Sequence, residues 1–89
     1  MALTDEFAAA QLRVKQLKQT PDASELLELY ALFKQATVGD VTGDRPGMLD
    51  FKGRAKYDAW AGKKGGNKDT AMQSYVTLVD KLADKFGTT

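Results

Sequence analysis

Two pairs of aromatic and cationic residues mark the stretch of the sequence that could do chemistry. Tyr30 and Lys34 are four positions apart, and so are Lys56 and Trp60. At this spacing two residues share one face of a helix, which would set each ring beside an ammonium group. A ring can stack on a flat base while the cation pairs with phosphate. The pattern therefore favours a nucleotide-like ligand.

The sequence offers little for catalysis or for metal binding. It contains no cysteine and no histidine, which excludes thiolate chemistry and removes the usual general base and the commonest metal ligand. The loop aspartates Asp40, Asp44 and Asp50 lack the spacing of a calcium site. We therefore predict a binding protein rather than an enzyme, with no metal and no cofactor.

The positive charge is concentrated in one block. Residues 45–68 carry seven basic and two acidic side chains, a sum of +5, whereas the whole chain has a formal charge of only +1. A nearly neutral protein with one basic block suits a discrete anion site better than the coating of nucleic acid. No apolar run approaches the ~18 residues of a membrane span. The start lacks the features of a signal peptide, so we expect a cytoplasmic protein.

The first half of the chain carries two helical patterns. Apolar residues at the 3.6-residue period predict a helix over residues 4–18, with Thr4 as its N-cap and Lys15 in its last turns. A capping-box pattern at Asp22 predicts a second helix that runs to about Val38, with Gly39 after it in a left-handed conformation of positive φ. The apolar face of this second helix is wider than a simple stripe, so it should contact more than one neighbour.

A long loop and a short helix should follow. Residues 40–50 are rich in turn formers, and Pro46 with Gly47 is typical of a type II turn, in which the glycine takes a positive φ. A third helix is predicted over residues 51–61. Long irregular segments that persist in a small domain are often functional.

The longest apolar stripe predicts the last helix, from its N-cap at Asn67 to about Phe86, with Gly87 as its terminator. No segment shows the two-residue alternation of a strand. We therefore expect an all-α fold, a four-helix bundle in which residues 1–89 form a single domain. The expected core residues are Phe7, Val14, Leu27, Phe33, Tyr75, Val79 and Leu82.

Several of the candidate residues also have purely structural explanations. Phe33 or Tyr75 alone would be expected in the core, and a lone Trp60 is typically the largest core side chain of a small bundle. Arg54 and Asp58 could form an ordinary pair on a solvated helix face. The remaining lysines of the basic block are expected to serve solubility: Lys63, Lys64 and Lys68.

Three segments together carry a resemblance to a known family. Residues 30–40 read YALFKQATVGD, residues 45–47 read RPG and residues 56–60 read KYDAW. In combination they closely resemble the acyl-CoA-binding proteins, a family also known as diazepam-binding inhibitor. The resemblance covers essentially the whole chain. It implies a monomeric four-helix bundle that binds medium- and long-chain acyl-CoA thioesters, as an intracellular carrier and pool former with at most transient membrane contact.

The resemblance also implies a set of ligand-binding residues. Tyr30, Lys34 and Lys56 would surround the ribose 3′-phosphate, and the ring at position 33 would lie by the adenine. The family commonly has tyrosine at position 33 and tryptophan at position 57, where this chain has Phe33 and Tyr57. Phe33 keeps a stacking face but lacks a hydroxyl. The implied set is Lys15, Tyr30, Phe33, Lys34, Lys52, Lys56 and Tyr75.

Two other classes of protein fit part of the pattern. A helical nucleic-acid-binding module would also use basic and aromatic residues, although the nearly neutral charge argues against it. A helical protein-interaction module, or a peptide precursor without a small-molecule ligand, stays open as an alternative.

Overall fold

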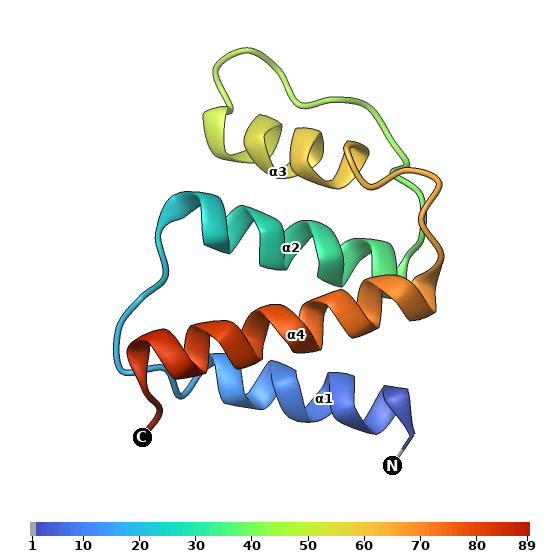
Figure 1. Cartoon of the computed structure of the whole chain (residues 1–89). Helices are drawn as coiled ribbons and strands as arrows, with labels where there is room; N and C mark the ends of the chain where they lie inside the picture. Colours follow the sequence, from blue (N-terminus) through green and yellow to red (C-terminus); the bar gives the residue numbers. More distant parts are fainter. Residues whose placement is uncertain (1) are drawn as a thin grey trace.

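The computed structural model describes residues 2–89, which form four α-helices (Figure 1). The all-α, four-helix fold that the sequence predicts is thus confirmed. The helices are α1 (Leu3–Val14), α2 (Ala23–Thr37), α3 (Phe51–Ala61) and α4 (Lys68–Phe86).

The helices lie in a row rather than around a common axis. Figure 1 shows the order α3, α2, α4, α1, and α4 contacts both α1 and α2. Within residues 2–89, α3 contacts α2 as its one helical neighbour and buries only Trp60. The molecule is correspondingly flat, with principal extents of 37 × 28 × 15 Å. Most of α3 is therefore available to solvent or to a ligand.

The start of α1 differs from the prediction. Ala2 is the N-cap, in an extended backbone conformation, and its carbonyl accepts from the N–H groups of Asp5 and Glu6, both at 3.1 Å. Thr4 lies inside the first turn, so its prediction as the N-cap is wrong. No side chain caps this end, so the stabilisation here comes from Asp5 and Glu6, whose negative charges interact favourably with the helix dipole.

The end of α1 is determined by a contact with the far end of the chain. The helix stops at Val14 instead of continuing to residue 18. The Lys18 N–H donates to the carbonyl of Gly87 at 3.0 Å, and the Thr89 N–H donates to the carbonyl of Gln16 at 2.9 Å. These bonds pair the two segments in an antiparallel bridge, which requires an extended backbone and so ends the helix.

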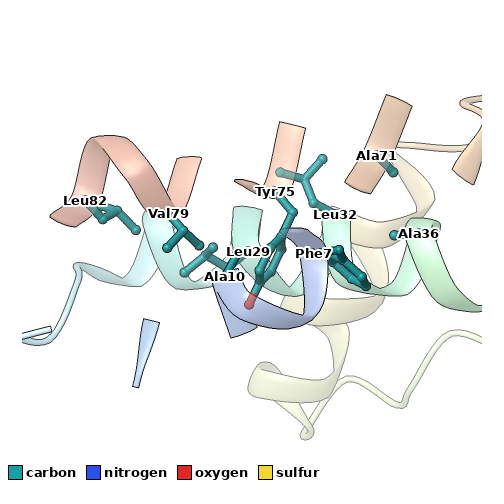
Figure 2. Close-up of a cluster of buried hydrophobic side chains, with 9 residues drawn as sticks. All are labelled: Phe7, Ala10, Leu29, Leu32, Ala36, Ala71, Tyr75, Val79 and Leu82. Atoms are coloured by element: carbon teal, nitrogen blue, oxygen red, sulfur yellow. The ribbon is translucent and has the colours of Figure 1, made fainter. Parts of the chain in front are cut away.

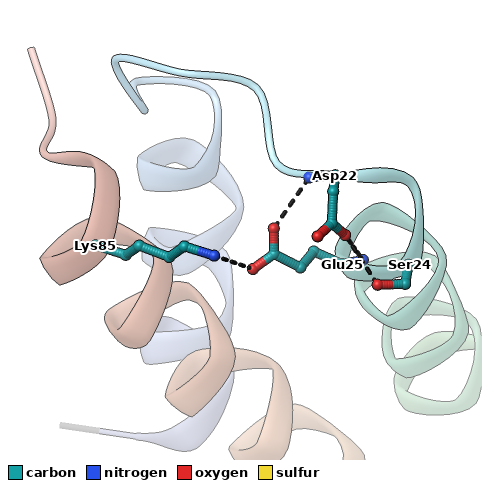
Figure 3. A network of polar contacts seen from close by, with 4 residues as sticks. All are labelled: Asp22, Ser24, Glu25 and Lys85. Atoms are coloured by element: carbon teal, nitrogen blue, oxygen red, sulfur yellow. Dashed lines mark hydrogen bonds and ion pairs between the residues drawn. The ribbon is translucent and has the colours of Figure 1, made fainter.

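The start of α2 follows the prediction closely (Figure 3). The Asp22 carboxylate accepts from the Glu25 N–H at 2.8 Å, and the Glu25 carboxylate accepts from the Asp22 N–H at 3.0 Å. The Ser24 hydroxyl adds a third bond to Asp22, and Lys85 of α4 reaches Glu25 at 3.3 Å. At the other end, Gly39 takes the predicted positive φ, of 98°.

The loop over residues 40–50 is irregular, as predicted, but its turn is a different one. Gly47 does not have a positive φ, so the type II turn at Pro46 and Gly47 is wrong. Instead, the Asp50 N–H donates to the Gly47 carbonyl at 3.0 Å. This turn places the Asp50 carboxylate to accept from the Gly53 N–H at 2.9 Å, which caps α3.

Side chains of α3 hold the loop in place. The Arg45 guanidinium makes a two-bond pair with the Asp58 carboxylate, at 2.8 and 2.7 Å, and the Tyr57 hydroxyl donates to the Gly43 carbonyl at 3.0 Å. Asp58 therefore pairs with Arg45 and not with Arg54, contrary to the prediction. The loop brings both Nε and an amino group of Arg45 to the two carboxylate oxygens of Asp58, and such a two-bond pair is stronger than a single contact.

The predicted N-cap of α4 and its end are confirmed. The Asn67 side chain accepts from the Thr70 N–H at 2.7 Å, and Gly87 follows the helix with a φ of 78°. The core lies where α1, α2 and α4 meet (Figure 2). Of the residues predicted for it, four are buried, namely Phe7, Tyr75, Val79 and Leu82, whereas Val14, Leu27 and Phe33 are partly buried.

Candidate functional site

A groove with a volume of about 310 Å³ lies between the first half of α2 and the first turns of α3. Its apolar walls include Leu26 and Leu27 of α2 and Phe51 of α3. The groove uses the part of the wide α2 face that does not pack against α4. A groove of this kind can accept the apolar part of a ligand, because removing such a part from water is favourable.

The polar rim of the groove contains three of the predicted site residues. Tyr30 projects from α2, and Lys52 and Lys56 project from successive turns of α3. Both lysines are exposed, and within residues 2–89 neither forms an ion pair. The groove therefore combines apolar walls with uncompensated positive charge at its edge.

The aromatic–cation pairs form across the helices and not along them. The Lys56 Nζ lies 5.4 Å from the centre of the Tyr30 ring, and the Lys34 Nζ lies 4.8 Å from the centre of the Trp60 ring. The i,i+4 spacing predicted a contact within each helix, Tyr30 with Lys34 and Lys56 with Trp60. In the structure each ring instead contacts the lysine of the other helix. Each contact is a cation–π interaction that joins the two helices. As a result, both ammonium groups lie along the seam between them.

Trp60 anchors α3 to the end of α2, which agrees with its predicted structural role. The ring is 7% exposed, and its Nε1–H donates to the carbonyl of Gly39 at 2.7 Å. A buried indole needs such a partner for its N–H group. The same ring lies under Lys34, so the anchor also positions a candidate ligand residue.

A second anchor, which the sequence analysis missed, ties the linker after α3 to α2. The buried amide of Gln35 donates to the Asp40 carboxylate at 3.0 Å and to the Gly66 carbonyl at 2.7 Å. Asp40 also accepts from the Gly65 N–H at 2.9 Å. This N–H, followed by the Gln35 amide, lowers the pKa of Asp40 below its ordinary value. The signal in the sequence was a polar residue, Gln35, on the buried side of α2, where its amide needs hydrogen-bond partners.

The other predicted site residues lie outside the groove. Phe33 stacks on Phe7 of α1, with ring centres 6.1 Å apart, and Phe7 meets Tyr75 edge to face at 5.1 Å. Tyr75 is buried in the core, and this burial raises the pKa of its hydroxyl. Lys15 is the exposed C-cap of α1. The structure thus gathers Tyr30, Lys52 and Lys56 at the groove, with Lys34 on the same seam, and places Phe33 with Tyr75 in a separate aromatic cluster.

Two cations of the basic block are already neutralised. Arg45 is paired with Asp58, and the Lys63 ammonium lies 2.7 Å from the Glu28 carboxylate. Lys63 therefore links the start of the segment between α3 and α4 to α2. The prediction that Lys63 serves solubility alone is wrong. Of the remaining cations of the block, Lys52 and Lys56 lie at the groove, and Lys34 of α2 adds a third charge on the seam.

The part of the chain that the structure describes holds no group of three or more carboxylate, histidine or cysteine side chains that could bind a metal ion. In the same residues, no helix combines the length and the apolar character that crossing a membrane requires.

Comparisons with known proteins agree with this architecture. The family model described as "Acyl CoA binding protein" matches residues 4–79. The chain is 55% identical to acyl-CoA-binding protein homolog 1 of Caenorhabditis elegans over 85 residues, which cover 96% of this chain and 99% of the relative. The crystal structure of Oryza sativa acyl-CoA-binding protein 2 superposes with a TM-score of 0.89 at 42% identity, over 93% of this chain and 90% of that chain. The structure of the Moniliophthora perniciosa protein gives a TM-score of 0.87 at 39% identity, over 99% and 86%. The chain therefore belongs to the acyl-CoA-binding protein family.

Proposed function

We propose that this chain binds medium- and long-chain acyl-CoA thioesters with high affinity, as a monomeric single domain over residues 1–89. It would act in the cytoplasm as a carrier and pool former for acyl-CoA and would catalyse no reaction. The observation that carries the proposal is the groove between α2 and α3, which joins apolar walls to lysines without an ion pair among residues 2–89, in a member of this family.

The nucleotide end of the ligand would bind along the seam between α2 and α3. Tyr30, Lys34 and Lys56 are the proposed partners of the ribose 3′-phosphate. The cross-helix contacts support this assignment, because they bring one cation from each helix to a shared seam. Phosphate accepts charge-assisted hydrogen bonds from ammonium groups, and the tyrosine hydroxyl can add another. Lys52 would bind a further anionic group of the same ligand.

The acyl chain would lie in the groove. Each methylene removed from water contributes about 0.8 kcal/mol, which is roughly a fourfold gain in affinity. The walls contributed by Leu26, Leu27 and Phe51 supply the apolar surface for this burial.

The aromatic cluster would support the adenine. We place Phe33 beside the base, since its partly exposed ring retains a stacking face. Lys15 and Tyr75 complete the proposed contact set. Because Tyr75 packs on Phe7, and Phe7 on Phe33, the buried tyrosine would also fix the position of the stacking ring.

A calorimetric titration of the purified protein with palmitoyl-CoA tests the proposal. We expect one ligand to bind per chain, and we expect palmitate and duplex DNA to bind far more weakly. Palmitate forfeits every nucleotide contact, and the nearly neutral chain has little attraction for DNA. Equal affinity for palmitate and its CoA thioester would contradict the proposal.

A further inference from the structure

The side chain and the backbone of Lys34 are both tied to the indole of Trp60. The Lys34 Nζ lies 4.8 Å from the centre of the indole ring, and the indole Nε1–H donates to the Gly39 carbonyl at 2.7 Å. The Gly39 N–H in turn donates to the Lys34 carbonyl at 3.1 Å. These contacts form a closed circuit, which starts at the Lys34 backbone and returns to the Lys34 ammonium group.

We propose that Trp60 is a positioning residue that determines specificity through Lys34. By holding the Lys34 ammonium group on the α2–α3 seam, the indole sets the preference of the protein for a ligand with a ribose 3′-phosphate over the same ligand without it. The inference rests on the proposed function, which places the 3′-phosphate at Lys34. It adds Trp60, which the sequence predicted to be structural, to the residues that select the ligand.

The indole at the centre of the circuit is firmly held. Trp60 is 7% exposed and is the one buried residue of α3 within residues 2–89. Gly39 has a φ of 98°, which glycine adopts without strain, and this conformation turns the backbone at the end of α2. The Lys34 carbonyl also accepts from the Val38 N–H at 2.8 Å. The ring is therefore a fixed platform for the ammonium group.

Within residues 2–89, the Lys34 ammonium group forms no ion pair that would compete with the ring. A lysine side chain has many rotamers, and restricting them when a ligand binds costs free energy. The attraction between the ring face and the cation restricts these rotamers before binding. An ammonium group has three N–H donors, so it can lie over the ring and still pair with phosphate. The contact therefore prepares Lys34 for its ligand.

The indole itself has no group left for the phosphate. Its single N–H is bonded to the Gly39 carbonyl, whereas the Tyr30 hydroxyl on the same seam is a proposed phosphate donor. The Lys56 Nζ also lies farther from the Tyr30 ring, at 5.4 Å, and Lys56 is exposed while Lys34 is partly buried. Trp60 can therefore influence the phosphate only through Lys34.

Fluorinated tryptophan tests the inference while the shape of the side chain is nearly kept. Trp60 is the only tryptophan in the sequence, so replacing tryptophan by an analogue alters this position alone. Fluorine atoms on the benzene part of the indole weaken the attraction of the ring face for a cation and leave the N–H donor in place. Wild-type protein and its monofluoro and trifluoro forms, made by chemical synthesis, are titrated with palmitoyl-CoA and with palmitoyl-dephospho-CoA.

The ratio of the two affinities is the decisive readout, because a purely structural role of the ring would weaken both ligands alike. We expect the preference for palmitoyl-CoA to fall stepwise with the number of fluorines, by about two- to fivefold in the trifluoro form. The melting temperature and the affinity for the dephospho ligand should change little. In a Lys34→Ala background, fluorination should leave the ratio unchanged.

Three other results overturn the inference. A ratio that stays constant or rises on fluorination would show that the ring does not prepare the lysine, and the proposed function would stand. A fall that persists in the Lys34→Ala background would show that the ring acts by a route other than Lys34. If the wild-type protein bound neither ligand, the proposed function would fall and this inference with it.

Discussion

The Lys56 ammonium of α3 lies 5.4 Å from the centre of the Tyr30 ring of α2. The two residues belong to different helices, so the contact forms only when α2 and α3 are packed together. The second contact also joins the two helices, because the Lys34 ammonium of α2 lies over the Trp60 ring of α3. The proposed phosphate site is therefore a property of the α2–α3 seam.

Lys34→Ala should weaken acyl-CoA binding by roughly 10- to 150-fold. A hydrogen bond to a charged partner is worth about 1.5–3 kcal/mol, which gives this range. The loss should be much smaller with the acyl ester of dephospho-CoA, because that ligand lacks the 3′-phosphate. Calorimetry with both ligands measures the coupling between the lysine and the phosphate. Lys64→Ala is the matched control and should change little. An equal loss with both ligands would remove Lys34 from the phosphate site.

Affinity should rise with acyl chain length and then level off. Each methylene that enters the groove contributes about 0.8 kcal/mol, a gain of roughly fourfold, until the apolar walls are covered. A series of saturated acyl-CoA thioesters in competition with a fluorescent acyl-CoA gives the curve. If short and long chains bound equally well, the groove would not be the acyl site.

Val79→Asp should unfold the domain. Val79 has no exposed surface and lies in the core between α4 and its neighbours, where a carboxylate has no partner. Circular dichroism during heating should show loss of the helical signal or a large drop in the melting temperature. Thr77→Asp, on the exposed side of the same helix, is the matched control. A Val79→Asp variant that melts like the wild type would refute the core assignment.

Stability should be insensitive to pH between about 5 and 8 and should fall in acid. The chain has no histidine to titrate near neutrality. Asp22, Asp40 and Asp58 each have a pKa lowered from 3.8, by the Glu25 N–H, the Gly65 N–H and Arg45 respectively. A lowered folded-state pKa means that the stabilisation is present above 3.8 and is lost as the pH falls through the folded-state value.

Melting curves of Asp40→Asn and Asp58→Asn, recorded from acid to neutral pH, check whether these two carboxylates cause the loss of stability in acid. Each variant should be less stable than the wild type at pH 7, with the difference shrinking in acid as the wild-type carboxylate is protonated. Asp84→Asn is the control, since Asp84 is exposed and makes no ion pair among residues 2–89. A constant difference at all pH values would show that protonation is not the cause.

Gln35→Ala should loosen α3 without unfolding the rest of the protein. It removes both bonds that the buried amide makes to Asp40 and to the Gly66 carbonyl, at a cost of about 0.5–1.5 kcal/mol for each hydrogen bond. Hydrogen exchange should become faster in α3 and its following linker, while α1 and α4 stay protected. Gln73→Ala, an exposed residue of α4, should leave the exchange pattern unchanged. Uniformly faster exchange would mean that Gln35 supports the whole fold.

Features that depend on neighbouring residues could be predicted from the sequence. The capping box at Asp22, the N-cap at Asn67 and the positive φ of Gly39 all follow from local hydrogen bonds or from backbone sterics. The apolar stripes also identified the first and last helices, because the 3.6-residue period is visible within each segment. The α3 bounds, Phe51–Ala61, agree with the prediction although α3 carries no such stripe, because turn formers precede it and glycines follow it.

Features that depend on distant residues could not be predicted. α1 ends early because residues 16–18 pair with the segment at Gly87. Asp58 selects Arg45 over Arg54 because the loop folds back on α3. The exchange of partners at the groove has the same origin, since the i,i+4 spacing says nothing about the helix across the seam. The sequence predicted Tyr30, Lys52 and Lys56 as candidate site residues, whereas the contacts that they make depend on how α2 and α3 pack.

The position of α4 between α1 and α2 has a consequence for synthesis of the protein on the ribosome. Of the four helices, α4 is made after the other three, yet it supplies Tyr75, Val79 and Leu82 to the core. A nascent chain that ends before residue 68 lacks the helix against which the backbone of α1 packs, and leaves α1 with side-chain contacts to α2 such as that of Phe7 with Phe33. α1 should therefore stay loosely packed and open to chaperones until α4 has emerged.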